Sequence, residues 1–153
     1  MDYNVQGVGK ITIDTVIFDL NGTLAVNGKL VEGVKDRIER LKNEGFRVYV
    51  VSTDHRGNGK ELADDLGVEF IYAETTNDKE DFIREFDPEM VAAIGNARVD
   101  IGLFDYARIS IATMQAEGIH AAIFRFVDII VTSVNDAIDI LLDKTTFENT
   151  MKK

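Results

Sequence analysis

Cysteine is absent from this chain of 153 residues. The protein therefore has no disulfide framework, no thiolate metal site and no thiol nucleophile, and an intracellular location fits this composition. Long hydrophobic runs are absent too: no stretch approaches the roughly 18 apolar residues of a membrane span. The first residues, MDYNVQGVGK, also lack the apolar core of a signal peptide. We expect a soluble cytoplasmic protein that does not enter a membrane.

Positive charge is scarce. Lys and Arg number 17 against 27 Asp and Glu, which gives a formal charge of −10, and the basic residues are scattered along the chain. Such a surface repels a phosphate backbone, so we expect no nucleic-acid partner. Hydrophobic residues at 45% and charged residues at 29% are typical of a globular chain, and the length suits a single domain over residues 1–153.

Short apolar runs alternate with amphipathic stretches along the chain. Strands are expected at Ile11 to Phe18 and in the runs FRVYVVS, VEFIYA, MVAAIG, RISIATM and VDIIV. Helices are expected in EGVKDRIERLKN, GKELADDLG and NDKEDFIREF, after Gly95, near His120 to Phe126, and from Val134 to Leu142. Apolar strands separated by helices predict an α/β fold, a doubly wound, Rossmann-like parallel sheet with helices on both faces.

Local signals refine this expectation at a few places. Residues 1–10 are expected to form a small hairpin or an edge strand, and the tail KTTFENTMKK, residues 144–153, is expected to fray. Asn77 or Asp78 is the expected N-cap of the helix in NDKEDFIREF. Asn27-Gly28 is a hairpin signal shortly after the first buried strand.

Polar residues follow four of the expected strands at the point where each strand ends. They are Asp19 to Thr23, Ser52 to Asp54, the stretch from Glu74 to Lys79, and Gly95-Asn96 through Asp100. In doubly wound sheets the ligand crevice lies beyond the carboxyl ends of the strands. The sequence therefore predicts that these residues share one site.

Four motifs at these strand ends resemble those of a known superfamily. DLNGTLA resembles the nucleophile motif of the haloacid dehalogenase superfamily, Asp-x-Asp-Gly-Thr-Leu, and more closely that of the phosphorylation domain of P-type ATPases, Asp-Lys-Thr-Gly-Thr. VVSTDHRGNGKELADDLGV, the segment of Lys79, and IGNARVDIGLF follow in the family order and extend the resemblance from residue 11 to about residue 143. The resemblance implies a small, soluble relative of these pumps.

The resemblance assigns the nucleophile to Asp19, whose carboxylate would attack phosphorus and form an aspartyl phosphate. The alternative is a strand-terminal Asp that caps the next turn. Lys79 would neutralise Asp19 and the phosphoryl oxygens. The alternative for Lys79 is a solvated lysine on a helix, with Lys60 as a rival for the catalytic role.

Phosphoryl oxygens need hydrogen-bond donors as well as positive charge. Ser52 can donate its hydroxyl, and backbone amides of the turn Asn21-Gly22-Thr23 can contribute, since Gly22 permits close approach. The resemblance thus implies a phosphate-binding set of Gly22, Thr23, Ser52, Thr53 and Lys79.

Mg²⁺ is the metal that the resemblance implies, because it takes hard oxygen ligands. The implied ligands are one oxygen of Asp19, the backbone carbonyl of Asn21 and the side chain of Asn96. Position 96 is Asn where the family usually has Asp, so we expect weaker Mg²⁺ binding. Asp100 is the carboxylate that remains in this motif, and we expect it to bind the metal directly or through water.

Asn21 replaces the family's acid–base carboxylate. That group protonates the leaving oxygen and later activates water, which is typically worth 10² to 10⁴ in rate. An amide cannot do so; phosphorylation of Asp19 can survive, but dephosphorylation should be slow. Asp54 is a possible substitute base, with a turn or capping role as the favoured alternative. His55 is read as a solvated loop residue and His120 as structural.

The sequence leaves no room for a cap domain between these motifs, so the site is expected to be open. An open site suits a macromolecular substrate or needs a neighbouring subunit that excludes water. We expect a Mg²⁺-dependent phosphohydrolase acting on a phosphorylated small molecule or a phosphoprotein, with homo-oligomer formation left open. The alternative is a catalytically degenerate binding or regulatory module, suggested by the amides Asn21 and Asn96 in one pocket.

Overall fold

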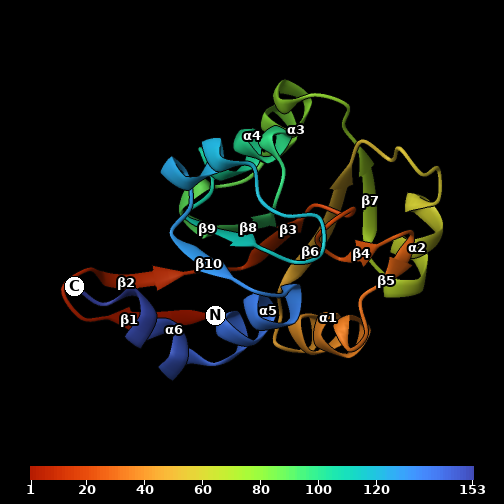
Figure 1. Cartoon of the computed structure of the whole chain (residues 1–153). Helices are drawn as coiled ribbons and strands as arrows, with labels where there is room; N and C mark the ends of the chain where they lie inside the picture. Colours follow the sequence, from red (N-terminus) through yellow and green to blue (C-terminus); the bar gives the residue numbers. More distant parts are fainter.

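The computed structural model describes all 153 residues and has a central parallel sheet of six strands (Figure 1). The strand order is β10-β9-β8-β3-β6-β7, and every neighbouring pair is parallel. The strands are β3 (Thr15–Phe18), β6 (Arg47–Ser52), β7 (Glu69–Tyr72), β8 (Val91–Gly95), β9 (Ile109–Thr113) and β10 (Ile129–Val131). The expected doubly wound α/β fold is confirmed.

Helices cover both faces of the sheet (Figure 1). They are α1 (Val34–Asn43), α2 (Gly59–Leu66), α3 (Thr76–Ile83), α4 (Ile101–Phe104), α5 (Val134–Leu142) and α6 (Lys144–Met151), with short 3₁₀ turns at Pro88–Met90, Arg98–Asp100 and Ala121–Arg125. None of these helices combines the length and apolarity needed to cross a lipid bilayer.

The central strand β3 divides the core into two layers. Its side chains alternate: Val16 and Phe18 pack into the larger apolar cluster beside α1 and α5, whereas Ile17 packs into the smaller cluster beside α3 and α4. All four residues of β3 are buried, because β6 and β8 flank the strand and helices cover both faces. This central strand delivers Asp19 to the carboxyl edge of the sheet.

The N-terminal segment forms a hairpin of its own. Strands β1 (Asp2–Val5) and β2 (Gly9–Thr12) pair antiparallel in a separate sheet of two strands, so the segment is not an edge strand of the central sheet. A second small hairpin, β4 (Ala25–Val26) and β5 (Lys29–Leu30), follows β3. Its turn has positive φ at Asn27 (52°) and Gly28 (78°), as the Asn-Gly signal predicts.

The expectation that residues 144–153 fray is wrong. Residues 144–151 form helix α6, which Asp143 caps by accepting hydrogen bonds from the N–H groups of Thr145 and Thr146. Phe147 is fully buried against Tyr3 of the hairpin, with 4.0 Å between ring centroids. The hairpin supplies the apolar partner that the tail sequence alone does not reveal.

The N-cap of α3 also differs from the expectation. Thr75 caps the helix by accepting a hydrogen bond from the N–H of Asp78, whose side chain in turn accepts from the N–H of Thr75. The expected caps, Asn77 and Asp78, lie inside the first turn. This reciprocal capping box fixes the start of the helix that carries Lys79.

Candidate active site

Buried polar side chains gather at the carboxyl edge of the sheet. Of the ten buried polar or charged residues in the protein, eight lie there: Thr113 at the end of β9 and seven others, Asp19, Asn21, Thr23, Ser52, Lys79, Asn96 and Asp100. Burying such groups is costly unless they find partners, so their concentration at one edge indicates a functional site. All of them except Thr113 belong to the set expected from the sequence.

Lys79 lies between the two carboxylates of the site. Its Nζ is 2.9 Å from Oδ1 of Asp19 and 2.6 Å from Oδ1 of Asp100, and its side chain is fully buried. The rival Lys60 instead pairs with Asp64 on the exposed surface of α2. The lysine that faces the nucleophile is therefore Lys79.

Asp100 holds both Lys79 and the turn after β8. Its Oδ2 accepts hydrogen bonds from the N–H groups of Asn96 (2.9 Å) and Ala97 (2.8 Å), while its Oδ1 faces Lys79. Gly95 permits this arrangement, because a Cβ there would lie 2.4 Å from Oδ2 of Asp100. Both carboxylate oxygens already have protein partners, which favours a positioning role over direct metal ligation.

Two carboxylates, Asp19 and Asp100, share one lysine. This excess of negative over positive charge shifts the pKa values of the site. Burial raises the pKa of Asp19 to about 6, and the charge of Asp100 adds to the rise, which Lys79 partly offsets. Burial alone lowers the pKa of Lys79, but Asp100 and Asp19 outweigh it, so the net pKa is raised. Lys79 therefore stays protonated near neutral pH, and the ionised site carries one excess negative charge.

The turn after Asp19 does not offer all the amides expected of it. The N–H of Gly22 donates to the carbonyl of Ala25 (2.8 Å), and the N–H of Thr23 donates to that of Leu20 (3.1 Å). Both N–H groups close the turn, so the phosphate-binding role expected of them, which stays a prediction, would have to compete with these bonds. The N–H of Asn21 remains without an intramolecular partner.

Asn21 has the least satisfied side chain of the site. It is 8% exposed, and neither its Oδ1 nor its Nδ2 has a hydrogen-bond partner. An unpaired buried amide is costly, so this side chain is poised for a ligand. Thr23 completes the turn, with its hydroxyl 3.3 Å from both Oδ2 of Asp19 and Oδ1 of Asn96.

Ser52 lies at the end of β6 with its hydroxyl directed to the same loop. Its Oγ accepts a hydrogen bond from the N–H of Asp54 (2.9 Å), which leaves the hydroxyl proton free to donate. Thr53 follows it and is half-buried. Asp54 has φ of 53° and accepts from the N–H of Gly59 (2.8 Å), which supports its turn role rather than a role as base.

The two histidines stand apart from the chemistry. His55 is exposed on the loop after β6. His120 uses Nδ1 to accept a hydrogen bond from the N–H of Ala122 (3.1 Å) at the start of a 3₁₀ turn. The structural role expected for His120 agrees with this contact.

Sequence reasoning missed the loop after β9, residues 114–120. Gln115 donates from Nε2 to the carbonyl of Thr23 (2.8 Å), and Asn96 donates from Nδ2 to the carbonyl of Gly118 (3.0 Å). A pocket of about 430 Å³, lined by residues 96–98 and 117–120, opens beside it. No motif marks this loop, and only its position after a fifth strand end could have drawn attention to it.

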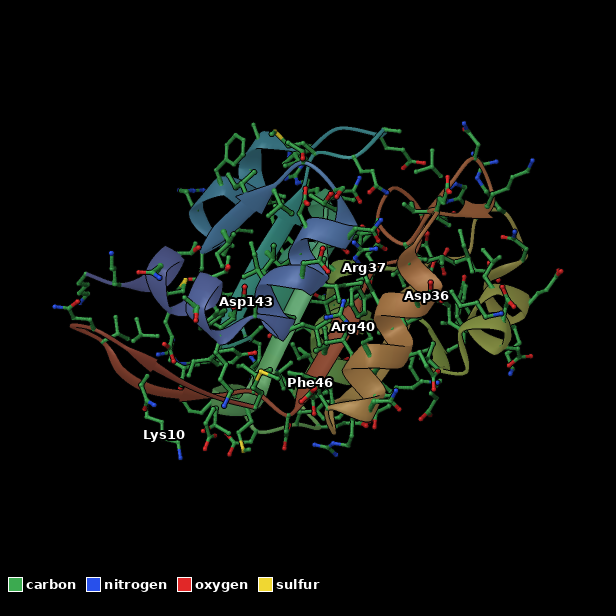
Figure 2. The ribbon with its side chains drawn as sticks, turned by 90° about the horizontal axis from the view of Figure 1, so that it is seen from below. Lys10, Asp36, Arg37, Arg40, Phe46 and Asp143 are labelled. Atoms are coloured by element: carbon green, nitrogen blue, oxygen red, sulfur yellow. The ribbon has the colours of Figure 1, made fainter.

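The larger hollow of the protein, about 520 Å³, lies between α1, α5 and α6. Figure 2 shows Arg37 and Arg40 on the side of α1 that faces α5. Arg37 makes a two-point ion pair with Asp139, at 2.8 and 3.0 Å. This pair joins α1 and α5 and makes no hydrogen bond to the buried polar residues at the carboxyl edge, so we interpret it as structural.

The residues present fit a hard metal ion. The protein has no cluster of three or more His, Cys, Asp or Glu side chains, so carboxylates alone make no metal site. Oxygen donors nevertheless lie close together, because Oδ2 of Asp19 and Oδ1 of Asn96 are each 3.3 Å from the hydroxyl of Thr23. The backbone carbonyl of Asn21, the ligand expected at that position, accepts no hydrogen bond within the protein. Such oxygens and an excess negative charge suit Mg²⁺.

Comparison with known proteins agrees with this geometry. No family model matches the sequence. A soluble P-type ATPase-like phosphatase from Methanocaldococcus jannaschii is 29% identical over 145 residues, which is 90% of this chain and 53% of that protein. The chain thus spans about half the length of this relative.

Solved structures share the fold. A cobalt-bound deoxy-D-mannose-octulosonate 8-phosphate phosphatase from Haemophilus influenzae superimposes with a TM-score of 0.71 at 18% identity, covering 93% of this chain and 94% of its own. A phospho-aspartyl intermediate analogue of phosphoserine phosphatase gives a TM-score of 0.70 at 16% identity, covering 84% and 98%. The chain thus has the fold of these phosphatases and is similar in sequence to a soluble P-type ATPase-like phosphatase.

Proposed function

We propose that this protein is a Mg²⁺-dependent phosphohydrolase that works through a phosphoenzyme on Asp19. The observation that carries the proposal is the fully buried Lys79 between Asp19 and Asp100 at the carboxyl edge of the sheet. A buried lysine there holds the nucleophile in place and keeps positive charge where phosphoryl oxygens would lie. The names of the relatives support the same reaction class.

The first step uses groups of this chain in distinct roles. A carboxylate oxygen of Asp19 attacks phosphorus, the bond from phosphorus to the ester oxygen breaks, and the released oxygen takes a proton from solvent. Lys79 and the hydroxyl of Ser52 stabilise the charge on the phosphoryl oxygens. Mg²⁺, when held by Asp19, Asn21 and Asn96, supplies additional positive charge at the phosphoryl group.

Asn21 limits the second step, hydrolysis of the aspartyl phosphate. Its unpaired Nδ2 can donate to a phosphoryl oxygen or to water, but an amide does not accept a proton from water. We therefore expect slow turnover and an appreciable lifetime of the phosphoenzyme. The open, capless site suits a phosphorylated small molecule or an exposed phosphorylated side chain of a protein.

The direct test measures phosphate release from an activated aryl phosphate. We expect release that requires Mg²⁺ and is abolished in Asp19→Asn, while the control Lys60→Met, which removes a surface lysine, keeps full activity. If no aryl phosphate or acyl phosphate is turned over, and no phosphate analogue such as a beryllium fluoride binds in an Asp19-dependent manner, the proposal fails.

A second candidate is a degenerate module that binds a phosphorylated partner without hydrolysing it. It is favoured by Asn96, whose amide serves a structural hydrogen bond to the carbonyl of Gly118. Asn21→Asp separates the two candidates. A large gain in turnover supports a slowed enzyme, whereas no activity, even with Asn96→Asp added, supports the binding module.

A further inference from the structure

The proposed function leaves one group unassigned, the base that activates water against the aspartyl phosphate. Asn21 cannot act as this base, and Asp54 is engaged by the N–H of Gly59. The carboxyl edge of the sheet presents one further carboxylate beside the nucleophile turn, that of Glu117 on the loop after β9.

The position of Glu117 is defined by its contact with Gly22. A Cβ built on Gly22 would lie 2.6 Å from Oε2 of Glu117 and 2.6 Å from Nδ2 of Asn96. The carboxylate of Glu117 therefore lies directly against the backbone of the turn Asn21-Gly22-Thr23. This is the same turn from which a carboxyl group at position 21 would act in other family members.

The loop that carries Glu117 is anchored to the site on both sides of this residue. Before it, Gln115 donates from Nε2 to the carbonyl of Thr23 (2.8 Å) and accepts at Oε1 from the N–H of Val134 (2.9 Å). After it, the carbonyl of Gly118 accepts from Nδ2 of Asn96 (3.0 Å). These contacts hold residues 115–118 over the nucleophile turn without a cap domain.

Asn96 makes two hydrogen bonds that help to hold this loop in place. Its Nδ2 donates to the carbonyl of Gly118, and its main-chain carbonyl accepts from the N–H of His120 (3.2 Å). A carboxylate at position 96 could not make the first of these bonds, because it has no donor. Asn21 itself cannot act as a base. Asn96, through its amide, helps to hold the loop that carries the carboxylate of Glu117.

We propose that Glu117 is the catalytic base of dephosphorylation, a role that rests on the proposed function. As the oxygen of a water molecule forms its bond to phosphorus, the carboxylate of Glu117 takes a proton from that water. The bond between phosphorus and Oδ of Asp19 breaks, its electron pair returns to the Asp19 carboxylate, and inorganic phosphate leaves. Glu117 is exposed, so it passes the proton to bulk solvent.

The test follows the phosphoenzyme itself in Glu117→Gln. The protein is labelled with ³²P-acetyl phosphate and Mg²⁺, freed of substrate, and sampled for acid-stable label that hydroxylamine removes. We expect Glu117→Gln to be labelled at the wild-type rate but to lose its label at least ~10²-fold more slowly in water. Glu85→Gln, an equal charge change in the exposed turn after α3, should behave as wild type.

Two further measurements distinguish a base from a residue that only shapes the loop. Hydroxylamine is a stronger nucleophile than water and depends less on a base, so it should remove the label from Glu117→Gln and wild type at similar rates. Asn21→Asp in the Glu117→Gln background should restore rapid dephosphorylation, because it supplies a carboxylate to the same turn.

The outcomes separate the two proposals. If neither the wild type nor Glu117→Gln is labelled, the phosphoenzyme and this inference both fall. If both proteins are labelled and lose the label at equal rates in water, the phosphoenzyme stands and the role of Glu117 is refuted. A Glu117→Gln protein that is labelled slowly but decays normally also refutes it, since the base acts only in the second step.

Discussion

At the scale of single residues, the site depends on how one lysine is shared. Asp100 has Lys79 and two backbone N–H groups as partners, whereas Asp19 has the same lysine and the more distant hydroxyl of Thr23. Asp19, the proposed nucleophile, is thus the less compensated carboxylate. Its raised pKa, about 6, is the result of burial and of the neighbouring Asp100 charge.

Because the ionised carboxylate of Asp19 is buried and poorly compensated, we expect Asp19→Asn to stabilise the protein while it abolishes activity. A pKa moved from 3.8 to about 6 corresponds to about 3 kcal/mol, so we expect a gain of about 1–3 kcal/mol at pH 8 without divalent ions. Because the pKa of Asp19 is raised in the folded state, its protonated form contributes fully to stability below pH ~4, and this contribution is lost as the pH rises through ~6. Urea unfolding should therefore show the gain of Asp19→Asn at pH 8 and little gain at pH 4; equal gains would contradict it.

Replacement of the lysine has the opposite effect. Lys79→Met leaves two buried carboxylates without a cation, and loss of one partner of a buried ion pair costs about 3–5 kcal/mol. We expect a loss of this size at pH 8 and a smaller one at pH 5, because Asp19 can then take up a proton. Thermal or urea unfolding at both pH values measures it.

Lys60→Met is the matched control for this experiment. Lys60 pairs with Asp64 on an exposed helix face, where an ion pair contributes about 0–1 kcal/mol. If Lys60→Met and Lys79→Met lower the free energy of unfolding by similar amounts, the buried position of Lys79 does not add to its contribution to stability.

Sequence reasoning located most of these residues, because strand ends and motif order identify them without tertiary detail. Asp19, Ser52 and Asn96 follow parallel strands and must meet at one edge. It could not decide which N–H groups of the turn at Gly22 are free, since that depends on bonds closed within the turn. It also missed Glu117, which reaches the site from a loop without any motif.

At the scale of elements, the turn after β3 and the loop after β9 form one unit. Gly22 has φ of 80° and is overlaid by the side chains of Asn96 and Glu117. The close approach of this loop requires the missing side chain at position 22 as well as its backbone conformation.

Gly22→Ala should therefore lower activity by more than the cost of placing alanine at a positive φ explains. The new Cβ would lie 2.6 Å from Nδ2 of Asn96 and from Oε2 of Glu117, so the ends of these two side chains must shift. We expect dephosphorylation to slow at least ~10-fold, as loss of positioning does in other sites. Gly45→Ala is the control: its φ is 93°, but no atom lies within 4 Å of the added Cβ. Equal activity of the two variants would contradict the packed loop.

The ends of the helices and strands are predicted less well from local sequence patterns than the elements themselves. The sequence predicts the six strands well, since continuous apolar runs of this kind suit a sheet covered on both faces. The run expected as one strand from Ile11 to Phe18 is divided, however, between β2 of the hairpin and β3 of the sheet. The N-cap of α3 was misplaced, because Thr75, Asn77 and Asp78 are all favourable caps, and the reciprocal bonds between Thr75 and Asp78 place the cap at Thr75.

At the scale of the whole molecule, the two ends of the chain close the side of the sheet remote from the site. Tyr3 donates from its hydroxyl to the carbonyl of Leu141 (2.6 Å) and stacks on Phe147 of α6. The tail is stable because of this partner, and a contact over such a sequence separation leaves no local signal that sequence reasoning could use.

Phe147→Ala should therefore destabilise the entire domain. Loss of a fully buried phenylalanine costs about 3–5 kcal/mol, and we expect that loss in urea unfolding, with the transition still cooperative. Phe124→Ala, at a residue that is 52% exposed, should cost less than about 1 kcal/mol. A Phe147→Ala protein as stable as Phe124→Ala would indicate that α6 is only loosely attached.

The pairing of Tyr3 with Leu141 and Phe147 also has a consequence for synthesis of the protein. The hairpin is made before its buried partners, since Tyr3 and its hydrogen-bond acceptor Leu141 are 138 residues apart in the chain. Strand β3, at the centre of the sheet, must likewise wait for β6 and β8. The core can therefore close only after α6 has been made, and until then Tyr3 lacks its buried partners.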